Sequence, residues 1–219
     1  MQRHFEEELA ELRQQLATMG TLVESMISQA VRFLTEHSTA EAGTLERDEE
    51  EVNRLHMQID EICLRLLALR QPAAADLRLV ASALKMNADL ERIGDQTVNL
   101  LNRAATLEQS GGEWPSVDLT PLVRVASGMV ADALDAFIRR DVDLAQKVLE
   151  DERSADALRH DIETELVRQA EDRAHSFVQT MQLVLVAHHL ERIADHATNI
   201  AEDVIYFLEG RDIRHQRTD

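Results

Sequence analysis

Several residue types that mark whole classes of protein are scarce in this chain of 219 residues. Cys63 is the only cysteine, which excludes an intrachain disulfide and a zinc site built on thiolates. Aromatic residues make up 3%, and seven glycines with three prolines are too few for the turns of a β-sandwich or barrel. Residues 1–71 and 122–219 contain no proline, the strongest helix breaker. Since alanine, leucine, glutamate, arginine and glutamine are abundant, the composition predicts an all-α protein.

Basic residues are also in the minority, with 23 against 41 acidic residues and a formal net charge of -18. Such a chain is a poor partner for nucleic acid or an anionic lipid surface, and it suits a cation or a basic protein surface. The longest run without a formal charge, 175–190, is shorter than the roughly 20 apolar residues of a membrane span. The first residues lack the apolar stretch of a signal peptide. We therefore expect a cytoplasmic protein with no direct membrane span.

Apolar residues recur at alternating steps of three and four, which is the spacing of one helix face. In the first segment they stand at Leu9, Leu12, Leu16, Met19, Val23, Met26, Ala30 and Phe33. Similar segments follow, separated by breaks at His37–Gly43, Pro72, 110–121, Arg139–Asp143 and near Arg173. The pattern predicts six long antiparallel helices, three in residues 1–109 and three in 122–219. The linker between the two three-helix bundles is 110–121, SGGEWPSVDLTP.

The two halves are related in sequence. Residues 90–99 read LERIGDQTVN and residues 190–199 read LERIADHATN, identical at six of ten positions. Upstream the match continues at an offset of 103, which pairs 48–49 with 151–152. A duplicated three-helix unit explains this better than chance.

The repeat carries oxygen-bearing side chains every four residues: Glu91, Asp95 and Asn99, then Glu191, Asp195 and Asn199. At this spacing the side chains share one helix face, where two carboxylates repel each other. A hard or borderline cation bound through oxygens would offset that repulsion in both halves.

Counting residues back from the predicted helix turns brings further oxygen ligands to the same level. Asp48 falls beside Asp95 in the first half, and Asp151 falls level with Asp195 in the second. Asn53 and Asp156 fall beside the two glutamates of the repeat. We therefore predict metal ligands at Glu91, Asp95, Asn99, Glu191, Asp195, Asn199, Asp48 and Asp151.

Blander interpretations compete with a metal site. An acidic stripe on a helix of a very acidic protein usually faces solvent. Asn99 and Asn199 could lie at the surface or form hydrogen bonds between helices. His188, His189 and His196 flank only the second motif, where they could add imidazole ligands or lie at the surface. No GxSxG, P-loop or GxGxxG motif is present. A carboxylate-bridged metal enzyme and a passive helical scaffold remain as alternatives.

The residues resemble the PhoU family, the accessory proteins of bacterial phosphate-specific transport. The resemblance is carried by LERIGDQTVN, LERIADHATN, ALRQPAAADLR at 68–78, the opening F-x-x-x-L-x-x-L and the ending AEDVIYFLEG. It implies two pseudo-twofold-related bundles with multinuclear clusters of iron or zinc on their surfaces. Glu91, Asp95, Glu191 and Asp195 match the family's E-x-x-x-D motifs, while the two asparagines, Asp48 and Asp151 come from geometry. The second half lacks a QPAAADLR counterpart, so the two clusters need not be identical.

The resemblance also implies a function. PhoU-like proteins are non-enzymatic negative regulators of the phosphate-starvation response that also modulate phosphate uptake. They link the phosphate ABC transporter, through its ATPase, to the phosphate sensor histidine kinase. They are cytoplasmic, typically homodimers, and reach the inner membrane only through protein partners.

Overall fold

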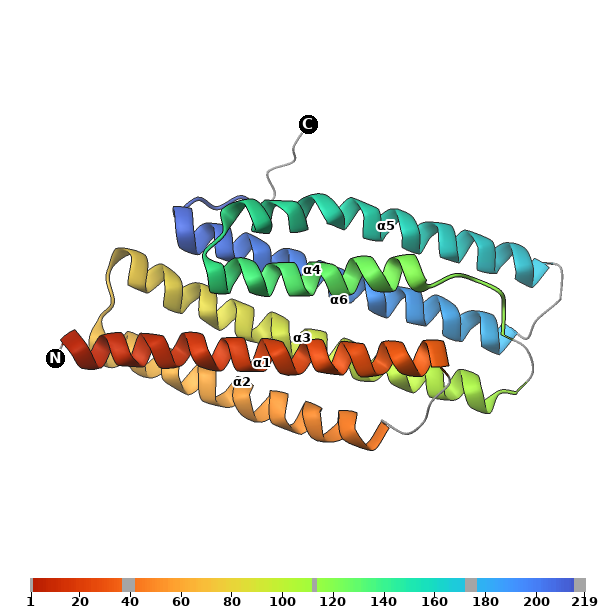
Figure 1. Cartoon of the computed structure of the whole chain (residues 1–219), viewed down its shortest axis with the longest axis horizontal. Coiled ribbons are helices and arrows are strands. Elements are labelled where there is room, and N and C mark those ends of the chain that lie inside the picture. Colours follow the sequence, from red (N-terminus) through yellow and green to blue (C-terminus); the bar gives the residue numbers. More distant parts are fainter. Residues whose placement is uncertain (1, 37–41, 112–113, 172–176, 215–219) are drawn as a thin grey trace.

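The computed structural model describes residues 2–36, 42–111, 114–171 and 177–214, in which every regular element is an α-helix. Figure 1 shows the six helices, α1 (Gln2–Glu36), α2 (Ala42–Arg70), α3 (Ala74–Gln109), α4 (Thr120–Arg139), α5 (Val142–Glu171) and α6 (Phe177–Glu209). The all-α prediction is therefore confirmed. The predicted break near Arg173, and most of the one at His37–Gly43, lie outside the described residues.

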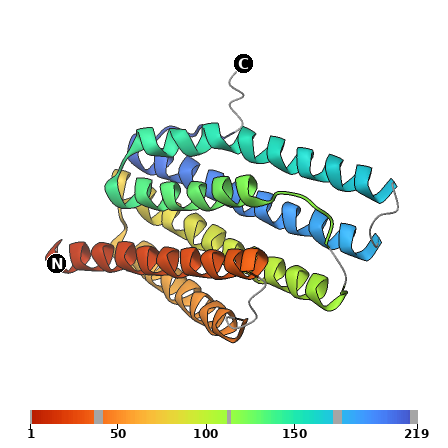
Figure 2. The same ribbon diagram turned by 45° about the vertical axis from the view of Figure 1, so that its right-hand side comes forward.

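Each half of the chain forms a bundle of three helices. Helices α1, α2 and α3 contact one another, as do α4, α5 and α6, while the halves meet through α3 against α6 and α1 against α4. Figures 1 and 2 show α2 and α5 at the two outer edges, with α1 and α4 lying over α3 and α6. In both views α1 runs opposite to α4, and α3 runs opposite to α6, as a pseudo-twofold axis requires. The predicted pair of bundles is thus confirmed.

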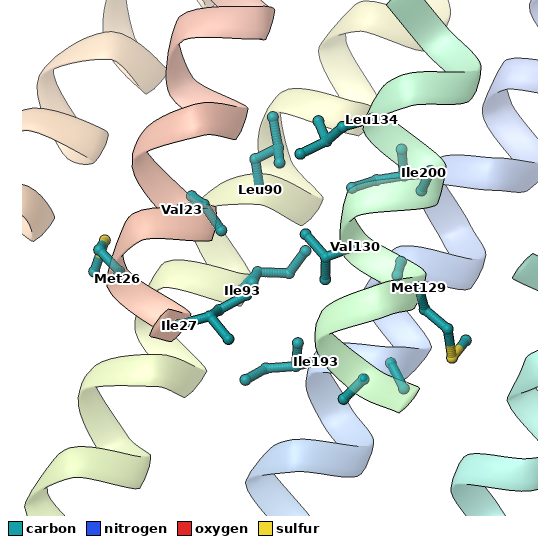
Figure 3. Close-up of a cluster of buried hydrophobic side chains, with 14 of the residues drawn as sticks. Val23, Met26, Ile27, Leu90, Ile93, Met129, Val130, Leu134, Ile193 and Ile200 are labelled. Carbon is teal, nitrogen blue, oxygen red and sulfur yellow. The ribbon is translucent and has the colours of Figure 1, made fainter. Parts of the chain in front are cut away.

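The two bundles share one hydrophobic core. Figure 3 shows side chains from both halves converging between the helices, among them Ile27 of α1, Ile93 of α3, Val130 of α4 and Ile193 of α6. Each of these four side chains is at most 4% exposed. Among the described residues, no helix is both long and apolar enough to cross a membrane. The halves are therefore fixed to each other by the same burial that stabilises each bundle.

Local sequence explains where the helices end. Helix α2 stops at Arg70, just ahead of Pro72, because a proline disfavours the right-handed helical conformation in the residue before it, and Gln71 takes a positive φ of 47° instead. Helix α6 stops at Glu209, and Gly210 takes the left-handed conformation (φ 72°) that glycine adopts without a steric penalty. The Gly210 N–H donates to the Tyr206 carbonyl at 2.8 Å, closing the last turn. Helix α4 begins at Thr120, so the last two residues assigned to the linker are helical.

Candidate metal centre

The second half contains a compact group of carboxylates on two neighbouring helices. Asp156 comes from α5, while Glu191 and Asp195 stand one turn apart on α6. One carboxylate oxygen from each of the three lies within 4.8 Å of the other two. Ligand oxygens 2.0–2.6 Å from one ion can be separated by up to about twice that distance, so these three oxygens could share a single cation. We call this group, together with Glu152 described next, the C-terminal acidic cluster.

Glu152 stands one turn before Asp156 on α5 and completes the group. Burial raises its pKa, and the neighbouring charges of Asp195 and Asp156 raise it further. Burial also raises the pKa of Glu191, with Asp195 adding to the effect, and burial is the main cause of the raised pKa of Asp195. Glu152, Glu191 and Asp195 are therefore partly desolvated and close together, so that their charged forms are disfavoured.

Basic side chains of the described residues pair with the α6 carboxylates of this cluster at 3.5–3.9 Å. Arg159 Nε lies 3.6 Å from Glu191 Oε1, and His188 Nδ1 lies 3.5 Å from Glu191 Oε2. Arg192 lies 3.9 Å from an oxygen of Asp195. Glu191 Oε2 is buried and accepts no hydrogen bond from the described residues. One oxygen of Glu191 is therefore left without a hydrogen-bond donor among the described residues.

The first half repeats the arrangement with different chemistry. Burial raises the pKa of Glu49 on α2, and its next largest cause is Asp95 on α3, so these two carboxylates are neighbours. Glu91 also acts on Glu49. Arg92 lies 3.0 Å from Asp95 Oδ2 and 3.4 Å from Glu91 Oε2, so one guanidinium engages both carboxylates of the motif. We call Glu49, Glu91, Asp95 and Asn53, the residue that aligns with Asp156, the N-terminal acidic cluster.

Four of the eight predicted ligands lie in the two clusters: Glu91, Asp95, Glu191 and Asp195. The other four are not placed in the clusters by any contact of the described residues. Gln29 of α1 donates to Asp48 at 2.7 Å, and Asp151 lies 3.7 Å from Lys147, which also pairs with Asp132 of α4. Asp48 and Asp151 therefore turn toward the first helix of their own bundle. Their neighbours Glu49 and Glu152 take the places next to the α3 and α6 carboxylates.

The asparagines of the repeat are not placed with the carboxylates. Asn199 donates to Asp89 of α3 at 3.1 Å, across the boundary between the halves, and no hydrogen bond in the described residues joins Asn99 to a cluster. His196 Nδ1 also lies 2.8 Å from Asp89, and His189 Nδ1 lies 2.8 Å from Gln96. Residues 89 and 96 align with 189 and 196, so these two pairs are equivalent positions across the pseudo-twofold axis. Two of the three histidines thus join the halves through Nδ1.

The donor set fits a cation that prefers oxygen. Carboxylates suit Mg²⁺, Ca²⁺ and Mn²⁺ and also bridge iron and zinc, whereas imidazole and thiolate ligands would favour softer ions. Burial and neighbouring charge lower the pKa of His189 to about 4, so this ring is neutral and adds no positive charge beside the cluster. The fit is closest in the C-terminal acidic cluster, where four carboxylates converge.

Comparison with known proteins places this geometry in a family. A family model, the PhoU domain, matches residues 16–104 and again 119–204, one match for each half. A phosphate-specific transport system accessory protein PhoU homolog of Pseudomonas putida is 40% identical over 97% of this chain and 84% of its own length. The crystal structure of PhoU from Pseudomonas aeruginosa superposes with a TM-score of 0.91 at 38% identity, covering 94% of this chain and 100% of that one. The crystal structure of the phosphate transport system regulatory protein PhoU from Streptococcus pneumoniae superposes with a TM-score of 0.86 at 28% identity. That match covers 95% of this chain and 98% of the other.

Proposed function

The chain belongs to the PhoU family, and from that premise we propose that it is a regulatory adaptor that represses the phosphate-starvation response. It would link the ATPase of the phosphate ABC transporter to the phosphate sensor histidine kinase, and modulate phosphate uptake. Support comes from its relatives, which are named as an accessory protein of phosphate-specific transport and as a regulatory protein of that system. We propose that it acts in the cytoplasm as a homodimer, held at the inner membrane by its partners.

The acidic clusters give this adaptor a metal-dependent surface. Glu152, Asp156, Glu191 and Asp195 would hold the ions in the second half, and Glu49, Glu91 and Asp95 would hold them in the first, with iron or zinc as the expected metals. A bound cation supplies positive charge where the carboxylates repel one another, and so fixes side chains that would otherwise separate. The observation that carries the proposal is the approach of the Asp156, Glu191 and Asp195 oxygens to within 4.8 Å.

A regulatory role without catalysis agrees with the chemistry of the remaining residues. Cys63 is fully buried, and burial raises the pKa of its thiol to about 12, so it is not a nucleophile at neutral pH. The clusters lie at the junction of two helices, with side chains 16–36% exposed at Glu191 and Asp195. Such partly exposed ions are suited to shape a protein-binding surface.

The experiment compares cluster variants in cells and in purified protein. Glu191→Gln with Asp195→Asn removes two negative charges and keeps the side-chain shapes. We expect this pair to lower the metal content after purification without chelator, and to raise expression from a phosphate-repressed reporter in cells grown with ample phosphate. A matched control, Glu150→Gln with Asp143→Asn, neutralises two exposed residues of α5 outside the cluster and leaves both readouts unchanged.

Circular dichroism checks that the helical fold is retained in both variants. Unchanged metal content together with unchanged repression would contradict the proposed role of the cluster. If metal is lost while repression persists, the adaptor role stands without the metal. Turnover of phosphoesters or dioxygen above that of the free metal would instead favour an enzyme.

A further inference from the structure

A groove of about 300 Å³ lies between α1 and α4, the two helices that contribute nothing to the acidic clusters. Glu24, Ile27, Ser28 and Val31 line it from α1, and Ser127 lines it from α4. Its volume is at the lower end of the range for small-molecule pockets, and Ser28 on its rim is exposed. Figures 1 and 2 show α1 and α4 side by side on one face of the molecule. The groove is therefore an open furrow that suits one or two protruding side chains better than a whole ligand.

Small residues border this furrow on α4. Ser127 is followed by the exposed Gly128 and, one turn later, by Ala131. A Cβ added at Gly128 would meet nothing within 4 Å, so no contact inside the chain requires glycine there. Glycine in a helix interior is less favourable than alanine, and its usual advantage is to let another backbone approach closely. The surface of α4 beside the groove is thus open to a close approach at Gly128, next to the lining residue Ser127.

The charged residue that lines the groove is an acidic one, Glu24. Burial raises the pKa of Glu24, and the nearby carboxylate of Asp135 raises it further. Asp135 is paired with Arg139 at 2.8 Å, whereas no described basic side chain pairs with Glu24. The half-buried Glu24 carboxylate therefore lies near the apolar Ile27 and Val31 without a cationic partner in the described residues. A lysine or arginine could supply one, because its charge is carried on an apolar chain that can pack against such residues.

We propose that the α1–α4 groove is the docking site for an amphipathic helix of a partner protein, with a lysine or arginine directed to Glu24. The apolar part of that side chain would lie over Ile27 and Val31, and its backbone would approach α4 at Gly128. The inference rests on the proposed adaptor role for the existence of a partner, but it does not involve the metal clusters.

The probe is a synthetic 18-residue helical peptide of alanine, leucine and lysine, with one lysine in the middle of its leucine face. Its control has the same composition in an order without an amphipathic face. Fluorescence anisotropy of the labelled peptide is measured with the full-length chain in chelator and 150 mM salt, where distant charges are screened. We expect one peptide per chain, and binding at least about tenfold tighter than that of the control peptide.

Variants locate the binding. Glu24→Gln removes the charged partner of the lysine and is expected to weaken binding about tenfold. Ser127→Trp and Ser28→Trp fill the groove from opposite walls, and each should abolish binding. The matched controls Glu150→Gln and Ser154→Trp, both exposed on α5, should bind as the wild type does. Two groove-filling variants keep the test valid if one of them fails to fold.

Equal binding of both peptides, or wild-type affinity in Glu24→Gln and in the folded tryptophan variants, would overturn the proposal. If a dimer of the chain binds the peptide more tightly than a single chain does, the groove belongs to an interface between copies. That result would also overturn the proposal. The reporter assay of the cluster variants is independent of these outcomes. Failure of the docking site is therefore distinguishable from failure of the regulatory role.

Discussion

The N-terminal and C-terminal acidic clusters occupy equivalent places in the duplicated fold, yet they differ in charge. The first offers three carboxylates and Asn53, with Arg92 held against both Glu91 and Asp95. The second offers four carboxylates, with Arg159 3.6 Å from Glu191 and Arg192 3.9 Å from Asp195. The duplicated helices thus supply the same scaffold to both halves, while the side chains at equivalent positions differ. We infer that the second cluster is the stronger metal site.

The largest expected effect on metal affinity comes from exchanging Asp156 and Asn53, the aligned residues at which the two clusters differ in charge. Asp156→Asn gives the second cluster the composition of the first, and we expect its metal affinity to fall about 10- to 100-fold, since cation affinity follows the number of charged ligands. Asn53→Asp makes the reverse change and should strengthen the first cluster. Isothermal titration of metal-free protein with Mn²⁺ or Zn²⁺ measures both affinities. Equal weakening by Asp161→Asn, an exposed α5 residue outside the cluster, would show that overall charge and not ligation is responsible.

Metal-free stability should reveal the same asymmetry. Glu152, Glu191 and Asp195 have raised pKa values in the folded chain, so the native state binds more protons than the unfolded state above about pH 4. Stability without metal therefore falls as pH rises from the ordinary carboxyl pKa through these raised values. Neutralising all three with Gln, Gln and Asn should stabilise the metal-free chain by about 1 kcal/mol at pH 7.5, and by less at pH 5.

Urea unfolding in chelator at the two pH values measures this difference. Glu49→Gln, the corresponding change in the first cluster, removes one such carboxyl and should gain less. A wild type more stable than the triple variant at pH 7.5 without metal would contradict the assignment of the cluster as electrostatically strained.

Gly94 and Ala194 differ at equivalent positions inside the two motifs. A Cβ on Gly94 would lie 3.5 Å from Val52 Cγ1 and 3.9 Å from Met26 Cε, which are ordinary contact distances. We therefore expect Gly94→Ala to stabilise the chain by about 0.5–1 kcal/mol, because alanine is the better helix former. Thermal unfolding at one pH is sufficient to detect the change. Destabilisation would mean that α2 and α3 pack more tightly than these distances indicate.

The smallest effect concerns the arginines that follow each glutamate of the repeat. Arg92→Ala removes a guanidinium that competes with a cation for Glu91 and Asp95, so metal affinity of the first cluster should rise a few-fold. Arg192→Ala should change the second cluster less, because its contact with Asp195 is 3.9 Å. Mn²⁺ titration of the two variants side by side tests the order of the effects.

The fold was predictable because each helix carries an uninterrupted apolar stripe. The positions expected to face inward in α1, from Leu9 to Phe33, are all buried. The sequence also contains the duplication that defines the pseudo-twofold arrangement. What periodicity does not reveal is that both bundles share one core, since that depends on how α3 and α6 pack.

The sequence allowed us to predict how far along each helix the candidate site lies, but not which side chains face it. Counting from the helix turns placed Asp48 and Asp151 at the correct level, and the structure brings Glu49 and Glu152 to those places. One residue along a helix turns the side chain by about 100°, and the rotation of α2 and α5 is set by packing against α1 and α4. Asp156, which the same count placed beside Glu191, is in the cluster.

The contacts across the centre were missed for a related reason. Asn199 and His196 both reach Asp89 on α3, a contact that depends on the docking of the halves. The signal that could have found it is the exchange of residue types between aligned positions. Asp89 and Gln96 in the first half correspond to His189 and His196 in the second, so each histidine has a suitable partner on the opposite helix.

The pairing of Asp89 with His196, and of Gln96 with His189, has an evolutionary consequence. In a dimer of identical subunits every substitution appears twice, so an aspartate at one position would face the same histidine on both sides of the axis. Fusion of the two copies into one polypeptide removes that constraint, because each locus now encodes a single partner. The repeats were thereby free to diverge separately, so that an acidic residue in one half could come to face a histidine in the other.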